Sequence, residues 1–238
     1  MPVHLWGGVC DMDALSAIAR QRGLAIVEDA AQAMGTRHRV RRAGALGTVG
    51  CFSAHPLKIF NALGDAGYVT TDSGEIAARD RLLRNHGLAD RDTVTEFGCE
   101  SRMDALQAAV LRFRLTRLDS LIERRRTNAA LYRELLKDAR LRLPRDKPYD
   151  FHTYVNFVSQ CEQRDGLQKH LAAKGVQTVV HYNTPIHLQP AAAGLGYRRG
   201  QFPVTERLCE TILALPANQT LSRDDVNFIS TEIRSFFR

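Results

Sequence analysis

The sequence predicts an α/β protein in which a sheet-containing first domain is followed by a small α+β domain. Two short apolar segments, residues 24–27 and 51–53, have the length of buried strands and lead into polar residues. After Met103, apolar residues recur every three or four positions as far as about Lys137, which predicts one long amphipathic helix or two abutting helices. Beyond Pro144, strand and helix patterns alternate, as is typical of a compact α+β domain.

Within that second domain, the patterns predict elements in a definite order. We expect strands at residues 153–159 and 177–181, and helices at residues 163–174, 204–213 and 224–236. In the first domain, Asp11 is a predicted cap for a helix that ends near Arg22.

Lys58 lies between an apolar strand and a glycine-rich turn in the sequence of residues 50–68, which reads GCFSAHPLKIFNALGDAGY. Pro56 ends regular structure, and residues 64–67 turn the chain into a second strand at residues 68–71. We therefore expect Lys58 on a loop walled by apolar residues, where desolvation favours the neutral amine that condenses with aldehydes. For a lysine considered alone, an exposed surface position is the commoner case.

Asp29 follows the apolar run at residues 24–27, at the carboxyl end of a predicted strand. Sites in open α/β sheets form at that edge. A carboxylate there can keep the ring nitrogen of pyridoxal phosphate protonated, and the cofactor needs that proton to withdraw electrons from a substrate. An Asp after a strand can equally cap a helix. The combination of Asp29 with Lys58 favours a pyridoxal phosphate site.

Six motifs in this chain resemble, in order, those of the DegT/DnrJ/EryC1/StrS aminotransferases, which are sugar aminotransferases of the fold-type I pyridoxal phosphate class. They are VEDAAQAMGT, GALGTVGCFSAHPLK, GDAGYVTT, FGCESRMDALQAAVL, HYNTPIHLQPA and QFPVTERLCETILALP, and they run over nearly all of the chain. The resemblance implies a fold-type I enzyme with a partial large domain at residues 1–120, built on a mixed sheet. A bridging helix and a small α+β C-terminal domain would occupy residues 121–238.

The resemblance also implies roles for the residues that match. Lys58 resembles the lysine that forms a Schiff base with the cofactor, and Asp29 resembles the partner of the ring nitrogen. Gln32 would pack beside the ring and its hydroxyl, and Ser53 would bind the phosphate. The family contains dehydratases with a histidine at the lysine position, so Lys58 favours an aminotransferase.

The implied reaction moves an amino group from an amino acid, expected to be glutamate, to a nucleotide-linked keto-sugar. The family builds its site from two subunits, so we expect a homodimer. Residues 181–187 of this chain read HYNTPIH, and in the family the segment that corresponds to them approaches the active site. The resemblance therefore makes His181, Tyr182 and His187 candidate substrate-binding residues. A histidine in such a loop more often satisfies local backbone groups, and that alternative stays open.

Three features depart from the family pattern. Relatives usually carry Asn where this chain has Glu100, and that Asn reaches across the dimer interface to the cofactor phosphate. A carboxylate repels a phosphate at a cost of ~1 to 3 kcal/mol if desolvated. Ile59 replaces a residue that is often Asn. The first residues resemble a strand well inside the large domain, so we expect the segment with a phosphate loop and a stacking aromatic to be missing. These departures support an alternative, a catalytically impaired family member or a non-catalytic partner subunit.

Charge, hydropathy and cysteine content bear on nucleic-acid-binding, membrane, secreted and metal-binding classes of protein. The net charge is +7, but the basic residues are dispersed except at residues 37–42, RHRVRR. That cluster is more typical of a solvated loop, or of a hairpin near an anionic substrate, than of a nucleic-acid reader. We find no apolar run that could span a bilayer and no signal peptide, so we expect a cytoplasmic protein. Five scattered cysteines without CxxC spacing predict reduced thiols and no metal site.

Overall fold

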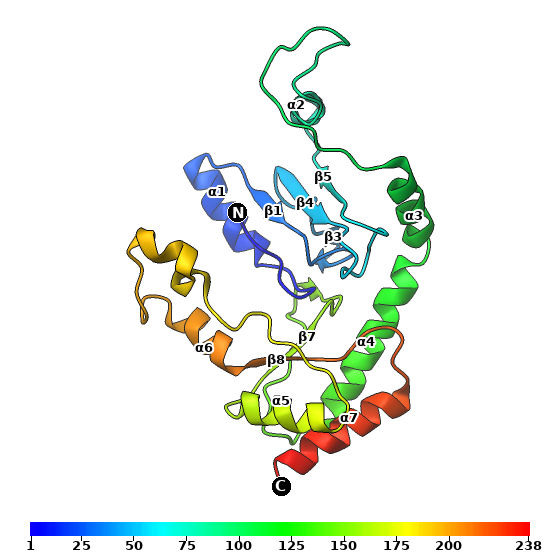
Figure 1. The fold of residues 1–238 in the computed structure, drawn as a ribbon, viewed down its shortest axis with the longest axis vertical. Helices are drawn as coiled ribbons and strands as arrows, with labels where there is room; N and C mark the ends of the chain where they lie inside the picture. Colours follow the sequence, from blue (N-terminus) through cyan, green and yellow to red (C-terminus); the bar gives the residue numbers. More distant parts are fainter. The chain divides into compact units, whose positions relative to one another are not determined.

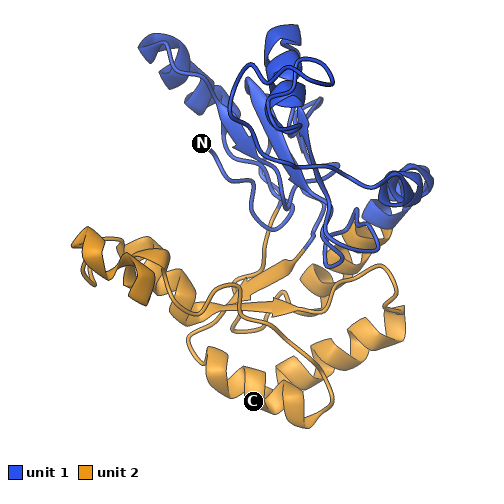
Figure 2. Cartoon of the chain, turned by 45° about the horizontal axis from the view of Figure 1, so that its top comes forward, with its two compact units in different colours: residues 1–123, 146–155 blue, residues 124–145, 156–238 orange.

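The computed structural model describes residues Met1–Arg238, which divide into two compact units. Figure 2 colours the first unit, Met1–Glu123 with Asp146–Val155, and the second, Arg124–Arg145 with Asn156–Arg238. The sequence placed a single boundary between residues 120 and 121. The division instead falls after Glu123, and a later ten-residue segment returns to the first unit.

The first unit is built on a mixed three-stranded sheet (Figure 1). Strand β1 pairs in parallel with β4, and β4 pairs antiparallel with β5. Val3 adds an isolated parallel bridge to Asp29 on the other side of β1. The strands are β1 (Val27–Asp29), β4 (Val49–Ser53) and β5 (Gly67–Thr70).

The predicted strand at residues 24–27 is largely a connection. Helix α1 (Met12–Arg22) begins at Asp11, whose side chain accepts the Ala14 N–H, and ends at Gly23, which adopts a left-handed conformation. Leu24 after it is 61% exposed, and regular pairing starts only at Val27. The apolar run therefore marked the approach to the sheet and not the strand itself.

The basic cluster at residues 37–42 forms a hairpin, which is one of the two arrangements that the sequence analysis predicted for it. Strands β2 (Arg37–His38) and β3 (Arg41–Arg42) pair antiparallel, and β6 (Asp150–Phe151) pairs with the other edge of β2. This pairing is the reason that Asp146–Val155 belongs to the first unit.

The predicted strand at residues 153–159 is consequently wrong over its first half. Thr153 is fully buried in the first unit, where its backbone N–H donates to Gly7 O at 2.9 Å and its hydroxyl lies 3.0 Å from that of Thr36. These contacts take residues 150–155 away from the later strand, which begins at Phe157.

Two helices follow residue 103, separated by a short break. Leu111, Leu118 and Ile122 from these helices are buried in one apolar cluster with Ile59 and Phe60. The helices are α3 (Ala105–Leu115) and α4 (Leu118–Leu135), and a separate helix, α2 (Gly74–Leu83), precedes them. The division between the two units falls within α4.

The second unit contains a two-stranded antiparallel sheet with helices, which agrees with the predicted α+β class. The predicted helix at residues 204–213 ends earlier, because Ile212 begins a strand of four buried residues. The predicted strand at residues 177–181 is reduced to an isolated bridge between Val179 and Ala214. The elements are β7 (Phe157–Gln160), β8 (Ile212–Leu215), α5 (Arg164–Ala173), α6 (Pro203–Thr211), α7 (Arg223–Phe236) and the 3₁₀ turns η1 (Ile186–Leu188) and η2 (Pro190–Leu195).

None of the helices combines the length and the apolar character needed to cross a bilayer.

Candidate active site

Asp29 ends β1 at the edge where parallel strands present their carboxyl ends. Its backbone is fixed to the N-terminal segment on one side of β1: its N–H donates to Pro2 O and its carbonyl accepts the His4 N–H, each at 2.9 Å. The register pairs Asp29 with Cys51, so Ser53 lies two residues farther along the neighbouring strand. By strand geometry the Cα atoms of Asp29 and Ser53 are about 8 Å apart.

The Asp29 carboxylate is half-buried and only partly used. Oδ1 accepts the Ala31 N–H at 3.0 Å, and Oδ2 has no hydrogen-bond partner. The chain continues into turns and not into a helix, so the helix-cap alternative is wrong for this residue. The bond to Ala31 is an Asx-turn, which orients the carboxylate and leaves one oxygen available.

Gln32 contacts the N-terminal segment. Its side-chain oxygen accepts the Trp6 N–H at 2.9 Å, across 26 residues of sequence. Trp6 has a positive φ of 59°, a conformation that few non-glycine residues adopt, so this bond helps to hold an unfavourable backbone turn. Gln32 therefore links the segment that borders β1 to the loop that follows Asp29.

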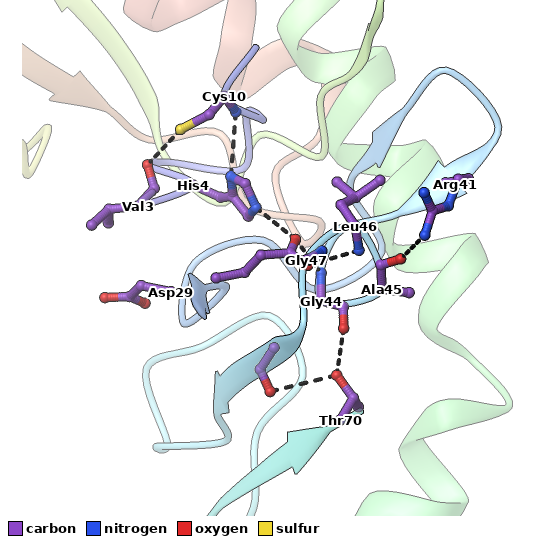
Figure 3. A network of polar contacts seen from close by, with 12 residues as sticks. Val3, His4, Cys10, Asp29, Arg41, Gly44, Ala45, Leu46, Gly47 and Thr70 are labelled. Atoms are coloured by element: carbon purple, nitrogen blue, oxygen red, sulfur yellow. Dashed lines mark hydrogen bonds and ion pairs between the residues drawn. The ribbon is translucent and has the colours of Figure 1, made fainter. Parts of the chain in front are cut away.

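Glu28, the residue before Asp29, is the common acceptor of a buried polar network, and Figure 3 labels its partners His4, Gly44, Leu46 and Gly47. Because side chains alternate along a strand, Glu28 points to the opposite face from Asp29. One of its oxygens, Oε2, binds His4 Nε2 at 2.9 Å and accepts the Gly44 N–H at 2.8 Å. The other, Oε1, accepts the N–H groups of Leu46 at 2.7 Å and Gly47 at 2.6 Å.

This network holds its members in place. The backbone nitrogen of Cys10 lies 3.3 Å from His4 Nδ1, and His4 Nε2 lies 2.9 Å from Glu28 Oε2. Burial opposes the charged imidazole, but the contacts with Cys10 and Glu28 outweigh it and raise the pKa of His4 to about 9. Burial opposes ionisation of Glu28, but the hydrogen bonds from His4 and from three backbone N–H groups outweigh it and lower the pKa of that carboxyl. The sequence analysis missed this pair, although an ionisable residue inside a buried strand was a usable signal.

The turn at residues 44–47, which supplies the backbone donors to Glu28, packs closely against the sheet because Gly44 and Gly50 carry no side chains. Gly44 has a φ of +85°, and a Cβ atom there would lie 2.3 Å from the Phe52 ring. A Cβ atom on Gly50 would lie 2.3 Å from Gly44 Cα. Only glycine fits at either position without moving β4.

Lys58 lies on the loop after β4, as predicted. It is half-buried, and its ammonium group makes no hydrogen bond or ion pair. Its backbone N–H donates to His55 O at 2.9 Å, and the next two residues, Ile59 and Phe60, are buried in the apolar cluster. An unpaired amine on an anchored loop is chemically available.

Ser53 is the last residue of β4 and has a hydroxyl with donor capacity to spare. Its Oγ accepts the His55 N–H at 3.3 Å, so the O–H remains free to donate to an anion. Asp29, Ser53 and Lys58 thus come from the ends of two adjacent parallel strands and the loop that follows one of them.

Glu100 is an exposed residue with an arginine and a histidine nearby. Its carboxylate lies 3.6 Å from Arg102 Nε and 3.9 Å from His86 Nε2. An isolated antiparallel bridge to Asn85 holds its backbone. The negative charge that distinguishes this chain from the family pattern is therefore partly balanced by Arg102.

The three candidate substrate residues lie in the second unit. His181 and Tyr182 are adjacent, with ring centroids 5.6 Å apart, and Tyr182 is 57% exposed. His187 is different, because its Nε2 lies 3.0 Å from Glu206 Oε1 and both side chains are buried. Glu206 also accepts the Gly200 N–H at 2.8 Å, which makes His187 part of a local network. This arrangement favours the alternative that His187 satisfies local groups.

Comparison with known proteins covers almost the whole chain. The model of the DegT/DnrJ/EryC1/StrS aminotransferase family matches residues 1–234. The erythromycin biosynthesis sensory transduction protein EryC1 of Saccharopolyspora erythraea is 46% identical over 236 residues, 99% of this chain and 64% of the relative. The dTDP-3-amino-3,4,6-trideoxy-alpha-D-glucose transaminase of Streptomyces venezuelae is 41% identical over 237 residues, 99% of this chain and 62% of the relative.

Solved structures agree with the sequence comparison. The crystal structure of S. venezuelae DesV in complex with a ketimine intermediate matches with a TM-score of 0.96 at 41% identity, over 99% of this chain and 64% of that one. A DegT/DnrJ/EryC1/StrS aminotransferase from Brucella abortus matches with a TM-score of 0.94 at 35% identity, over 99% and 63%. The chain thus spans less than two thirds of the length of these relatives.

Proposed function

The chain belongs to the DegT/DnrJ/EryC1/StrS aminotransferase family, and from this premise we propose that it takes part in pyridoxal-phosphate-dependent amino transfer to a nucleotide-linked keto-sugar. We further propose glutamate as the amino donor. The observation that carries the proposal is the half-buried, unpaired Lys58 on the loop after β4, at the same sheet edge as a carboxylate with a free oxygen. The names of two relatives, transaminases that act on dTDP- and UDP-linked sugars, support the substrate class.

The residues present fit pyridoxal phosphate in type and in order. Asp29 Oδ2 is free to accept the N–H of a pyridinium ring. The Ser53 hydroxyl, on the neighbouring strand, is free to donate to a phosphate. Lys58 supplies an amine for the aldehyde, and Gln32 lies on the turn that follows Asp29. Each group of the cofactor thus has a residue of suitable chemistry in this unit.

When bound, pyridoxal phosphate supplies an electron-withdrawing ring that stabilises negative charge at the substrate carbon. Asp29 keeps the proton on the ring nitrogen, because a carboxylate oxygen that accepts the N–H favours the charged form. With the cofactor bound, the Lys58 amine would serve as the base that takes the proton from the substrate carbon and returns it. Proximity would favour this role, because the loop after β4 would hold the Lys58 amine near the bound cofactor.

For substrate binding we keep His181 and Tyr182 as candidates, since both lie on a loop and Tyr182 is exposed. His187 is a weaker candidate because it is paired with Glu206. We also propose a homodimer in the cytoplasm. A second candidate function, a catalytically impaired or non-catalytic partner subunit, is favoured by Glu100, a carboxylate where relatives usually carry Asn.

The half-reaction with glutamate tests the proposal. The chain is loaded with pyridoxal phosphate and mixed with L-glutamate, and 2-oxoglutarate is measured against chain concentration. We expect the product with the wild type and with Lys169→Arg, a matched control on α5, and none with Lys58→Arg. Cofactor retention without any 2-oxoglutarate would favour the non-catalytic alternative.

A further inference from the structure

The loop that carries Lys58 is closed by its own hydrogen bonds. The Ala62 N–H donates to Ala54 O at 2.8 Å and defines the ends of the loop. Asn61 crosses it, because its side-chain Nδ2 donates to Pro56 O at 2.6 Å. The Asn61 side chain therefore bridges the two arms of the loop, one at Pro56 before Lys58 and one at Asn61 after it.

One face of α3 contacts this loop at two polar points. Arg114 Nη1 donates to the Asn61 carbonyl at 2.6 Å and also to the Asn61 side-chain oxygen. Gln107 Oε1 accepts the Leu63 N–H at 2.8 Å. Gln107 and Arg114 lie seven residues apart, with Leu111 between them, and this spacing puts all three on one face of a helix.

Leu111 supplies the apolar contact on the same face. It is buried in a cluster with Ile59 and Phe60, the two residues that directly follow Lys58. The α3 face thus holds the loop by an apolar contact near the lysine and by polar contacts at Asn61 and Leu63.

The Lys58 ammonium itself makes no contact that fixes its place. A lysine side chain is flexible, so the position of Nζ depends on the backbone that carries it. We propose that Arg114 and Asn61 are positioning residues for Lys58: Arg114 orients Asn61, and Asn61 sets the separation of the loop arms so that the amine meets the aldehyde of the cofactor. This inference rests on the proposed function, in which Lys58 binds the cofactor covalently.

Borohydride trapping tests the inference without measuring amino transfer. Each chain is incubated with pyridoxal phosphate for increasing times and reduced, and the adduct on every lysine is quantified by peptide mass mapping. Lys169 and Lys174 provide an internal reference for non-specific labelling. The variants are Arg114→Gln, Arg114→Lys and Asn61→Ala, and the matched control is Arg112→Gln, an exposed arginine on the same helix.

We expect the rate of Lys58 labelling, relative to Lys169, to fall at least about tenfold in Arg114→Gln and Asn61→Ala. Arg114→Lys should recover part of the loss, since it keeps a charged donor, and Arg112→Gln should match the wild type. If Arg114→Gln does not fold, Asn61→Ala decides the question alone.

Two outcomes separate this inference from the proposed function. Wild-type labelling of Lys58 in folded Arg114→Gln and Asn61→Ala would overturn the positioning role and leave the cofactor lysine in place. Labelling of another lysine in the wild type would overturn the proposed site and the positioning role with it.

Discussion

The substitution Glu28→Gln should lower the free energy of unfolding of the first unit more than a substitution of an exposed residue does. The carboxylate accepts hydrogen bonds from four donors, two on each oxygen. In Glu28→Gln one oxygen becomes an NH₂ group, so two buried donors would face another donor. Leaving two buried donors unpaired and His4 without its anionic partner predicts a loss of about 3 to 5 kcal/mol in the free energy of unfolding.

The pH dependence gives this prediction a sign. The pKa of Glu28 is lowered in the folded state, so the carboxylate stabilises the fold above its ordinary pKa of 4.5. That contribution is lost as the pH falls through the lower, folded-state pKa. A protonated Glu28 resembles Gln because it also presents a donor on one oxygen. The difference in stability between wild type and Glu28→Gln should therefore be full at neutral pH and shrink in acid.

Trp6 makes the measurement specific to the first unit. It is the single tryptophan of the chain, and its backbone N–H donates to the Gln32 side chain in the first unit. Urea unfolding followed by Trp6 fluorescence would give the free energy at each pH. The control is Glu96→Gln, a partly exposed residue paired with Arg79 at 2.9 Å, which should cost about 1 kcal/mol or less. A loss below about 1 kcal/mol in Glu28→Gln, or a loss unchanged in acid, would refute the reasoning.

Three further predictions concern other parts of the chain. Ser222→Ala removes a capping box in which the Asp225 N–H donates to Ser222 Oγ at 3.1 Å. It should destabilise α7 by about 1 kcal/mol, measured by urea unfolding followed by circular dichroism, whereas Thr231→Ala in the interior of the helix should not. Glu100→Asn should raise the affinity for pyridoxal phosphate about tenfold, because it removes a negative charge, although Arg102 already balances part of it; an unchanged dissociation constant in a cofactor titration would contradict this. Light scattering at micromolar concentration should detect a two-fold dimer, and a monodisperse monomer would rule out the proposed assembly.

Local signals predicted the elements that local chemistry specifies. Asp11 and Gly23 bound α1 because a side-chain acceptor and a left-handed glycine satisfy its ends. The turn before β5 was visible from its glycines, and the apolar spacing after residue 103 gave the helices α3 and α4. These features need no knowledge of distant residues.

Non-local contacts account for the elements that were missed. The first two residues of β8 were assigned to a helix because they follow α6 without a break in apolar character, and only pairing with β7 makes them a strand. Residues 150–151 join the first unit through pairing with β2, a partner more than 100 residues earlier. Sequence patterns carry no record of such partners.

The site shows the same division. Asp29, Ser53 and Lys58 were predicted from strand ends and from the family motifs, and the structure brings them to one edge of the sheet and its following loop. The supporting residues were not predicted. Glu28 needs His4 and three backbone N–H groups from a distant turn, and Asn61 needs Arg114 from a helix more than 50 residues away.

The identity of the lysine that binds the cofactor tests the account most directly. The wild-type chain is saturated with pyridoxal phosphate, reduced with borohydride and mapped by mass spectrometry, with Lys58→Arg in parallel. The account predicts one dominant reduced adduct on Lys58 and its loss in Lys58→Arg, with the visible absorbance of the bound cofactor lost in the same variant. A dominant adduct on Lys137 or Lys174, or equal labelling of the wild type and Lys58→Arg, would contradict it.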